Sequence, residues 1–187
     1  MTYNFVTDAD IHAILKEEFK LGMTDSYFAG EDPSTFVKKA EKTALSQMKN
    51  RLAGRFNVDL LFTIPNEWSK ALQYKDGERV RINDRFYIAS ADNSNVEPKP
   101  TSTIWTEDDP RDPMLVMFCC DILVYHLHAR HNPRALTEIR VKRYDDALKE
   151  LKAMEHKQEN PPFPTIVDDP RNPLEYGFDM KERGHFF

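Results

Sequence analysis

The chain has 187 residues, of which 40% are apolar and 30% charged, with a formal net charge of −5. This length and composition suit one domain, or one domain with an insertion or an arm. The acidic balance argues against a nucleic-acid-binding module built on a broad basic face. The acidic balance does not exclude a protein that surrounds DNA without binding it tightly, because a channel with an acidic lining would let DNA slide through.

The sequence also indicates whether the protein is secreted or inserted into a membrane. The N-terminal stretch MTYNFVTDAD lacks a basic region followed by a long apolar run, so no signal peptide is predicted. The apolar run from Met114 to Leu127 falls short of the roughly 20 residues that a membrane-spanning helix needs, and Asp121 lies in its middle. We therefore expect a soluble protein made in the cytoplasm, with no membrane partner.

Two helices are predicted in the N-terminal third. Thr7 is a suitable N-cap, and the pattern predicts a short helix from about Asp8 to Lys20. Asp32 followed by Pro33 starts a second helix, which Gly54 ends. Its apolar residues recur at three- and four-residue steps, and its opposite face is expected to carry Lys38, Lys39, Glu41, Lys42 and Lys49.

The pattern changes between residues 58 and 111. The segment VDLLF and the later YKDGERVRINDRFYIAS alternate like strands, and Asn83-Asp84 is typical of a hairpin turn. A loop rich in turn residues follows Ala91, and Ile104-Trp105-Thr106 is predicted to be a last short strand. We interpret 58–111 as a small antiparallel β insertion.

The segment from Met114 to Arg130 is apolar on nearly all sides, which is typical of a helix buried in the centre of a fold. Asn132-Pro133 is expected to cap a final helix that runs to about Gln158, antiparallel to the central one. The predicted fold is thus mainly α, a bundle of about four helices formed by 1–57 and 112–160. The residues expected to form the core of the central helix are Leu115, Phe118, Cys119, Ile122 and Tyr125.

The last segment, 161–187, has four prolines in its first ten residues and many apolar side chains. Prolines exclude a long helix, and the apolar content is too high for a solubilising tail. We expect an extended arm that lies in a groove on its own domain or on a neighbouring molecule. The anchors expected to bind a partner are Phe163, Ile166, Leu174, Tyr176, Phe178, Phe186 and Phe187.

No catalytic constellation is predicted. His126 and His128 would lie on different faces of a helix, and only His128 and His131 are nearly aligned, so helix-end histidines are favoured over a metal site. Cys119 and Cys120 lie in the most apolar segment, which favours packing over nucleophilic chemistry. We therefore expect neither an enzyme nor a cofactor or metal.

Four aromatic residues of the insertion allow two interpretations. Trp68, Tyr74, Tyr87 and Trp105 follow a spacing that resembles the small carbohydrate-binding modules of bacterial chitinases. That resemblance implies exposed aromatic rings that stack on sugars, and it makes a glycan-binding module on a helical scaffold the alternative function. The other interpretation is that these residues form the core of a very small β unit.

Three packing motifs resemble those of the Mu-like phage head–tail connector (adaptor, or head-completion) proteins. They are an LAGRY-type helix end, a CCDIARY-like core and an RY..AL..L pattern, here Leu52–Phe56, Cys119–Tyr125 and Arg143–Leu151. The similarity covers about Phe5–Asn57 and Asp112–Pro164, whereas the insertion and the arm after Pro164 depart from the pattern. Arg55 is a candidate partner for Asp121.

The resemblance implies a structural subunit of the virion, found at the head–tail interface. Such subunits form a ring, typically dodecameric, below the portal protein, and extend the DNA channel towards the tail. The implied partners are the portal, tail or stopper and terminator proteins, neighbouring copies of the chain, and genomic DNA that passes through the lumen without specific binding. No cofactor is implied.

Overall fold

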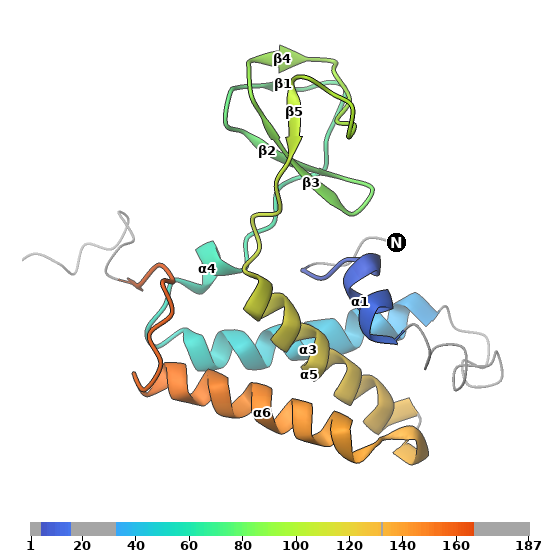
Figure 1. Cartoon of the computed structure of the whole chain (residues 1–187), viewed down its shortest axis with the longest axis vertical. Helices are drawn as coiled ribbons and strands as arrows, with labels where there is room; N and C mark the ends of the chain where they lie inside the picture. Colours follow the sequence, from blue (N-terminus) through green and yellow to red (C-terminus); the bar gives the residue numbers. More distant parts are fainter. Residues whose placement is uncertain (1–4, 16–32, 132, 167–187) are drawn as a thin grey trace, which may run out of the picture.

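The computed structural model describes residues 5–15, 33–131 and 133–166 (Figure 1). Its helices are α1 (Asp8–Leu15), α3 (Pro33–Leu52), α4 (Val58–Leu61), α5 (Pro113–His131) and α6 (Glu138–Glu155), with a 3₁₀ turn at Pro133–Ala135. Its strands are β1 (Gln73–Tyr74), β2 (Arg79–Ile82), β3 (Arg85–Ala89), β4 (Asn93–Ser94) and β5 (Trp105–Glu107).

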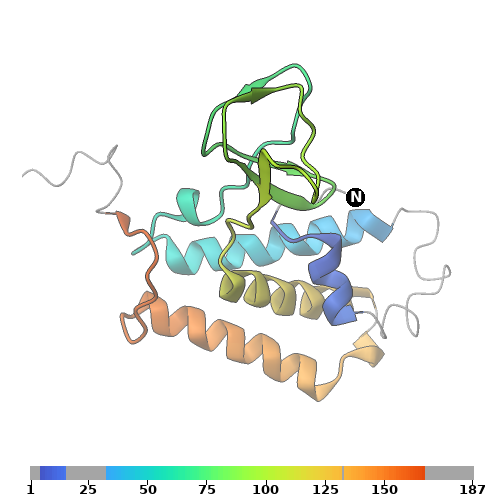
Figure 2. The same ribbon diagram turned by 45° about the horizontal axis from the view of Figure 1, so that its top comes forward.

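The prediction of a mainly α bundle of about four helices is wrong. The described residues contain five α-helices and two antiparallel sheets, so the fold is mixed α/β. The β residues form a separate body with a hydrophobic cluster of its own. Figures 1 and 2 show this β unit standing above the helices, joined to them by two connecting segments.

Helix α5 is the centre of the helical part, as expected. It packs against both α3 and α6, while α1 lies across it (Figure 1). Leu115, Phe118, Cys119 and Ile122 are buried, and Tyr125 is half-buried with its ring stacked on Tyr144 at a centroid distance of 3.8 Å. Burial of apolar side chains at about 1.5–3 kcal/mol each makes this helix the main source of stability.

Helix α3 packs by one apolar stripe. Pro33 begins it and Leu52 ends it, just before Gly54, which confirms the predicted bounds. One residue of its supposed exposed face was placed wrongly: Glu41 is completely buried. Its carboxylate accepts hydrogen bonds from the backbone N–H groups of Phe5 at 2.6 Å and Val6 at 3.0 Å, and buried charge needs such partners.

Helix α1 begins as predicted. The Thr7 side chain accepts a hydrogen bond from the backbone N–H of Asp10, and the Asp10 carboxylate accepts one from the N–H of Thr7. This reciprocal arrangement satisfies two free donors at the helix start. The expected end at Lys20 lies outside the described residues.

Two further expectations are corrected. The VDLLF segment forms helix α4 rather than a strand, because the Asn57 side chain caps it by accepting the Leu60 N–H at 3.2 Å. The final helix starts later than expected: Pro133 opens a 3₁₀ turn, and Thr137, in extended conformation, precedes α6. Helix α6 ends at Glu155, three residues before the predicted end.

The β unit contains a three-stranded sheet, in the order β2-β3-β5, and a two-stranded sheet of β1 and β4. The predicted hairpin is confirmed: Val80 pairs with Tyr87, Ile82 pairs with Arg85, and Asn83 and Asp84 adopt the positive φ angles that a tight hairpin turn requires. Strand β4 lies where the sequence indicated only a loop, and its two residues pair with β1.

Candidate functional site

The four aromatic residues of the insertion do not form an exposed platform. Tyr74, Tyr87 and Trp105 are each at most 7% exposed and make up most of the buried core of the β unit. The Tyr74 and Trp105 rings meet edge to face at 5.4 Å, and the Trp105 indole N–H donates to the Val96 carbonyl at 2.9 Å. A sugar ring could not stack on these faces, so the packing interpretation fits them.

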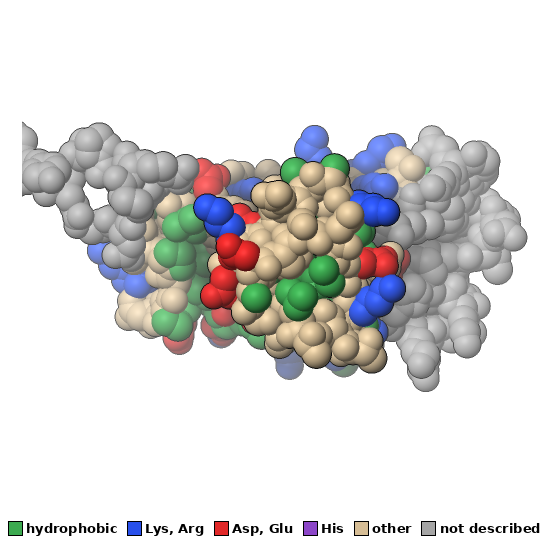
Figure 3. Space-filling model, turned by 90° about the horizontal axis from the view of Figure 1, so that it is seen from above, with side chains coloured by type: hydrophobic (Ala, Val, Ile, Leu, Met, Phe, Trp, Pro, Cys, Tyr) green, Lys and Arg blue, Asp and Glu red, His purple; other side chains and the backbone are tan. Residues whose placement is uncertain are grey.

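Trp68 differs from the other three because it is only half-buried, packed against the edge of that core. The β unit also has an open pocket of about 560 Å³, which is bordered by Gln73, Tyr74, Lys75, Glu78, Asp92, Asn93 and Ser94. Seen from above, the outer end of the β unit shows mostly backbone and uncharged polar groups with a few hydrophobic side chains among them, and charged side chains lie along its rim (Figure 3).

The beginning of the C-terminal arm lies on the protein's own helical part. Phe163 is buried against Phe56, with ring centroids 5.5 Å apart. The Pro164 carbonyl accepts the Asn57 N–H at 2.9 Å, and the Ile166 N–H donates to the Arg55 carbonyl at 3.2 Å. Phe163 is therefore a core residue and is not free to anchor a partner. The other expected anchors, apart from the half-buried Ile166, lie outside the described residues: Leu174, Tyr176, Phe178, Phe186 and Phe187.

Arg55 joins the end of α3 to the segment after α6, not to Asp121. Its guanidinium donates to the carbonyls of Met154 and Glu159, both at 2.8 Å, and to the side chain of Asn160. Burial raises the pKa of the Asp121 carboxyl, while Arg143 and Arg140 oppose that rise. The proposed Arg55–Asp121 pair is therefore wrong, and the arginines near Asp121 come from α6.

The cysteines and histidines of α5 do not form a reactive centre. Burial raises the pKa of the Cys119 thiol well above its usual value and that of Cys120 to about 12, so both are protonated at neutral pH. His126 Nε2 lies 3.1 Å from Gln47 Oε1, and burial lowers the His126 pKa. Within the described residues, no three His, Cys, Asp or Glu side chains are grouped to hold a metal ion.

Arg111 is the residue that sequence reasoning missed. Its nearly buried guanidinium donates to the Phe5 carbonyl at 2.7 Å, to Asp10 at 2.6 Å and to Asp109 at 2.7 Å. It also lies 4.7 Å from the centre of the Phe86 ring on β3. Arg111 thus connects the N-terminal segment, the returning connection and the β unit. The sequence around Arg111, DDPRDP, suggested only turns. The partners of Arg111 could not be found from this local pattern, because they lie up to 106 residues away in the chain.

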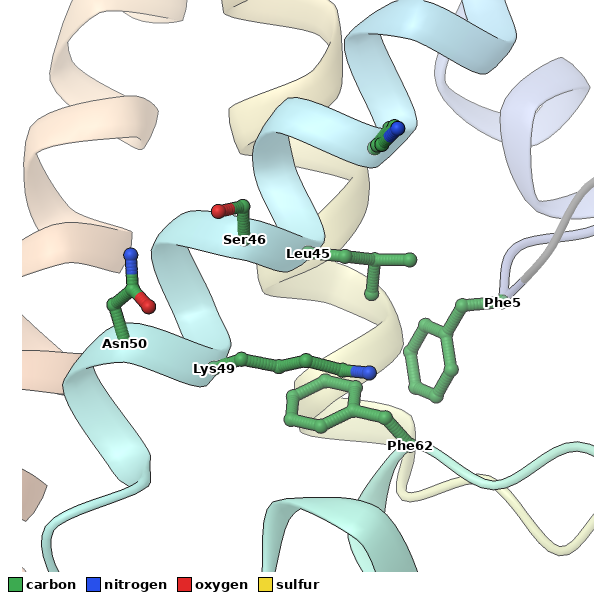
Figure 4. A pocket seen from close by; sticks show the side chains of 7 residues that line it. Phe5, Leu45, Ser46, Lys49, Asn50 and Phe62 are labelled. Carbon is green, nitrogen blue, oxygen red and sulfur yellow. The ribbon is translucent and has the colours of Figure 1, made fainter.

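A pocket of about 400 Å³ lies on α3, beside the N-terminal segment and the end of α4 (Figure 4). Leu45 points towards the Phe5 ring, and Lys49 extends across the Phe62 ring with its ammonium 5.6 Å from the ring centre. The residues that border it are Phe5, Lys42, Leu45, Ser46, Lys49, Asn50 and Phe62. Among the described residues that border the pocket, two are lysines and none is Asp or Glu.

Comparison of the chain with protein-family models, with curated proteins and with solved structures finds no match. In the described part of the chain, no helix has the length and apolar character needed to cross a membrane.

Proposed function

We propose that the chain is a structural virion protein that forms a ring, typically dodecameric, at the head–tail interface of a tailed phage. In this role it joins the portal to the tail and extends the DNA channel, with neighbouring copies, the portal and tail or stopper proteins as partners. DNA passes through the lumen without specific binding. The chain acts as a non-enzymatic component without a cofactor, inside the virion.

The observation that carries the proposal is the position of the three connector-like motifs. Leu52 and Phe56 of the first motif, Cys119 and Ile122 of the second, and Leu151 of the third are buried in one hydrophobic cluster. The motifs therefore occupy the residues by which α3, α5 and α6 pack together. A shared packing pattern supports a shared helical scaffold, and the β unit and arm are the parts free to differ.

The proposal is tested most directly in the phage that encodes the chain. Deletion of the gene should leave DNA-filled heads and separate tails in negative-stain images of the lysate, and supplying the gene from a plasmid should restore joined particles. Mass spectrometry should detect the chain in purified virions. Normal tailed particles from the deletion strain, or virions without the chain, would contradict the proposal.

The structure also sharpens the test of the arm. Deleting everything after Asn160 would remove Phe163 from the core, so any loss of binding could reflect misfolding. A truncation after Ile166 leaves Phe163 and both backbone contacts of the arm in place. This truncation should keep the circular dichroism spectrum of the full chain but lose co-purification with the portal. Portal binding equal to that of the full chain would remove the arm from the proposed interface.

A further inference from the structure

We propose that a groove between α3 and the C-terminal end of α5 binds a phosphate group, carried either by a small molecule or by a nucleic-acid backbone. Two hollows of about 430 and 210 Å³ form this groove, and Lys39 and Arg130 border both of them. The site lies within one subunit and does not rest on the proposed virion role. We define the groove by Lys39, Lys42, Ser46, Gln47, His126 and Arg130.

The positive charge of the groove is not compensated by the part of the chain that the structure describes. Lys39, Lys42 and Arg130 are exposed, and none of them forms an ion pair with another described residue. The described residues that border the two hollows include no Asp or Glu. The only carboxylate of α3, Glu41, is completely buried and accepts two backbone N–H groups. A chain with a net charge of −5 therefore presents three free cations together here.

The groove supplies more hydrogen-bond donors than a single carboxylate can use. The side-chain oxygen of Gln47 lies 3.1 Å from His126 Nε2, which leaves the Gln47 amide NH₂ to donate to a ligand. The exposed hydroxyl of Ser46 adds a second neutral donor. A carboxylate has one charge and two oxygens, whereas a phosphate has up to two charges and three or more acceptor oxygens, and arginine and lysine are its usual partners. Three cations and two neutral donors therefore favour phosphate.

The imidazole of His126 lies within reach of this positive charge. Burial lowers the pKa of His126, and the charge of Arg130 lowers it further. The other titratable groups beside it are Tyr125 and Tyr144, whose rings meet it edge to face, and Lys39 on the same hollow. A bound phosphate would offset the charge of Arg130 and raise the pKa of His126 towards its ordinary value. His126 thus provides a signal from inside the groove that is separate from the measured affinity.

Binding can be measured by NMR on the full-length chain, with inorganic phosphate and pyrophosphate as probes. We expect saturable shifts of the amide resonances of residues 39–47 and 126–130, together with a rise in the pKa of His126. In a second arm, the fluorescence anisotropy of a labelled short DNA duplex measures binding to backbone phosphates, which should weaken as salt is added. Tighter binding of the duplex than of pyrophosphate would identify a nucleic acid as the source of the phosphate, and the reverse would identify a small molecule.

Neutral variants show whether the groove is the place of binding. Lys39→Gln with Lys42→Gln should weaken binding of the tighter probe by about three- to tenfold at low salt. If that probe is the duplex, the slope of log K against log salt should fall by about 2, because each lysine contact with a phosphate contributes about 1. The matched control, Lys142→Gln with Lys149→Gln, changes the net charge equally at exposed residues of α6 and should leave binding unchanged.

Four results would overturn the proposal. The first is the absence of binding with all three probes. The second is equal weakening in the groove and α6 variants, or unchanged affinity in both the lysine variant and Arg130→Gln, with circular dichroism spectra like that of the full chain. The third is an unchanged pKa of His126 at saturating pyrophosphate, which would place the anion elsewhere. The fourth is an equal response to a poly-glutamate peptide, which would show that the groove attracts any negative charge.

Discussion

The helical part and the β unit are held together in different ways. The core of the helical part collects side chains from across the chain, from Phe5 through α3 and α5 to Phe163. The core of the β unit comes from one short stretch, with Tyr74 and Trp105 as its outer members among the buried residues. The first core depends on contacts between distant segments, whereas the second closes on itself, so damage to one should be separable from damage to the other.

The largest effect is expected from the β unit, whose core is small. Trp105→Ala removes a side chain 2% exposed and should destabilise that unit by about 3–5 kcal/mol. Amide resonances of β2, β3 and β5 should collapse towards unfolded positions while those of α5 persist. Trp68→Ala, at a half-buried site, is the matched control and should leave the sheet intact. Loss of the α5 resonances in the Trp105 variant would contradict the separation of the two cores.

The corresponding change in the helical part is Ile122→Ala. Ile122 is completely buried between the helices, and the variant should lower the free energy of unfolding by about 2–5 kcal/mol in urea titrations. Met117→Ala changes the same helix at a residue that is 50% exposed, so its effect should stay within about 0.5 kcal/mol. Similar midpoints for the two variants would show that α5 is not the centre of this core.

A smaller effect is expected where the two parts meet. Arg111→Met keeps a long side chain but leaves the Phe5 carbonyl, Asp10 and Asp109 without their shared donor, for a loss of about 1.5–3 kcal/mol. Residual dipolar couplings should show that the β unit changes its orientation relative to the helices. Arg79→Met, which breaks the exposed pair with Asp108, should lose only about 0–1 kcal/mol and keep the orientation. An unchanged orientation in the Arg111 variant would refute its connecting role.

The smallest effect concerns the thiols of α5. Because burial raises the pKa of Cys120 to about 12, the native state keeps a proton that the unfolded state releases near pH 9. The contribution of Cys120 to the free energy of unfolding should therefore be constant below pH 9. It should fall as the pH rises from 9 to 12. Cys120→Ala should remove part of that slope. At pH 8, a thiol reagent should label Cys119 and Cys120 only after urea is added, and labelling of the native protein would contradict the buried placement.

Local signals in the sequence were enough to predict much of the fold. Pro33 and Gly54 bound α3, Thr7 caps α1, and Asn83-Asp84 forms the hairpin turn, because each depends on residues within a few positions. The α4 segment was misjudged because five alternating residues suit a strand as well as a helix, and the Asn57 cap was the overlooked signal. The prediction treated the β residues as an insertion in a helical bundle. For this reason it missed that the fold is mixed α/β.

The candidate sites were less predictable because they depend on distant contacts. Glu41 looked like a surface residue, yet its partners are backbone groups 35 and 36 positions away. Arg111 finds Asp10 across 101 positions, and nothing in the local sequence distinguishes it from a turn residue. The spacing of the four aromatic residues of the β unit could not decide between a core and an exposed platform, and the structure buries Tyr74, Tyr87 and Trp105.

Phe5 meets both connections of the β unit: its ring lies 5.2 Å from that of Phe62 on the outgoing side, and its carbonyl accepts Arg111 on the returning side. The chain therefore leaves and re-enters the helical scaffold at one place. An inserted element whose two ends lie close together can be added, deleted or replaced as one piece without changing the path of the rest of the chain. The same junction offers protein engineers a ready insertion point for a reporter or a foreign epitope.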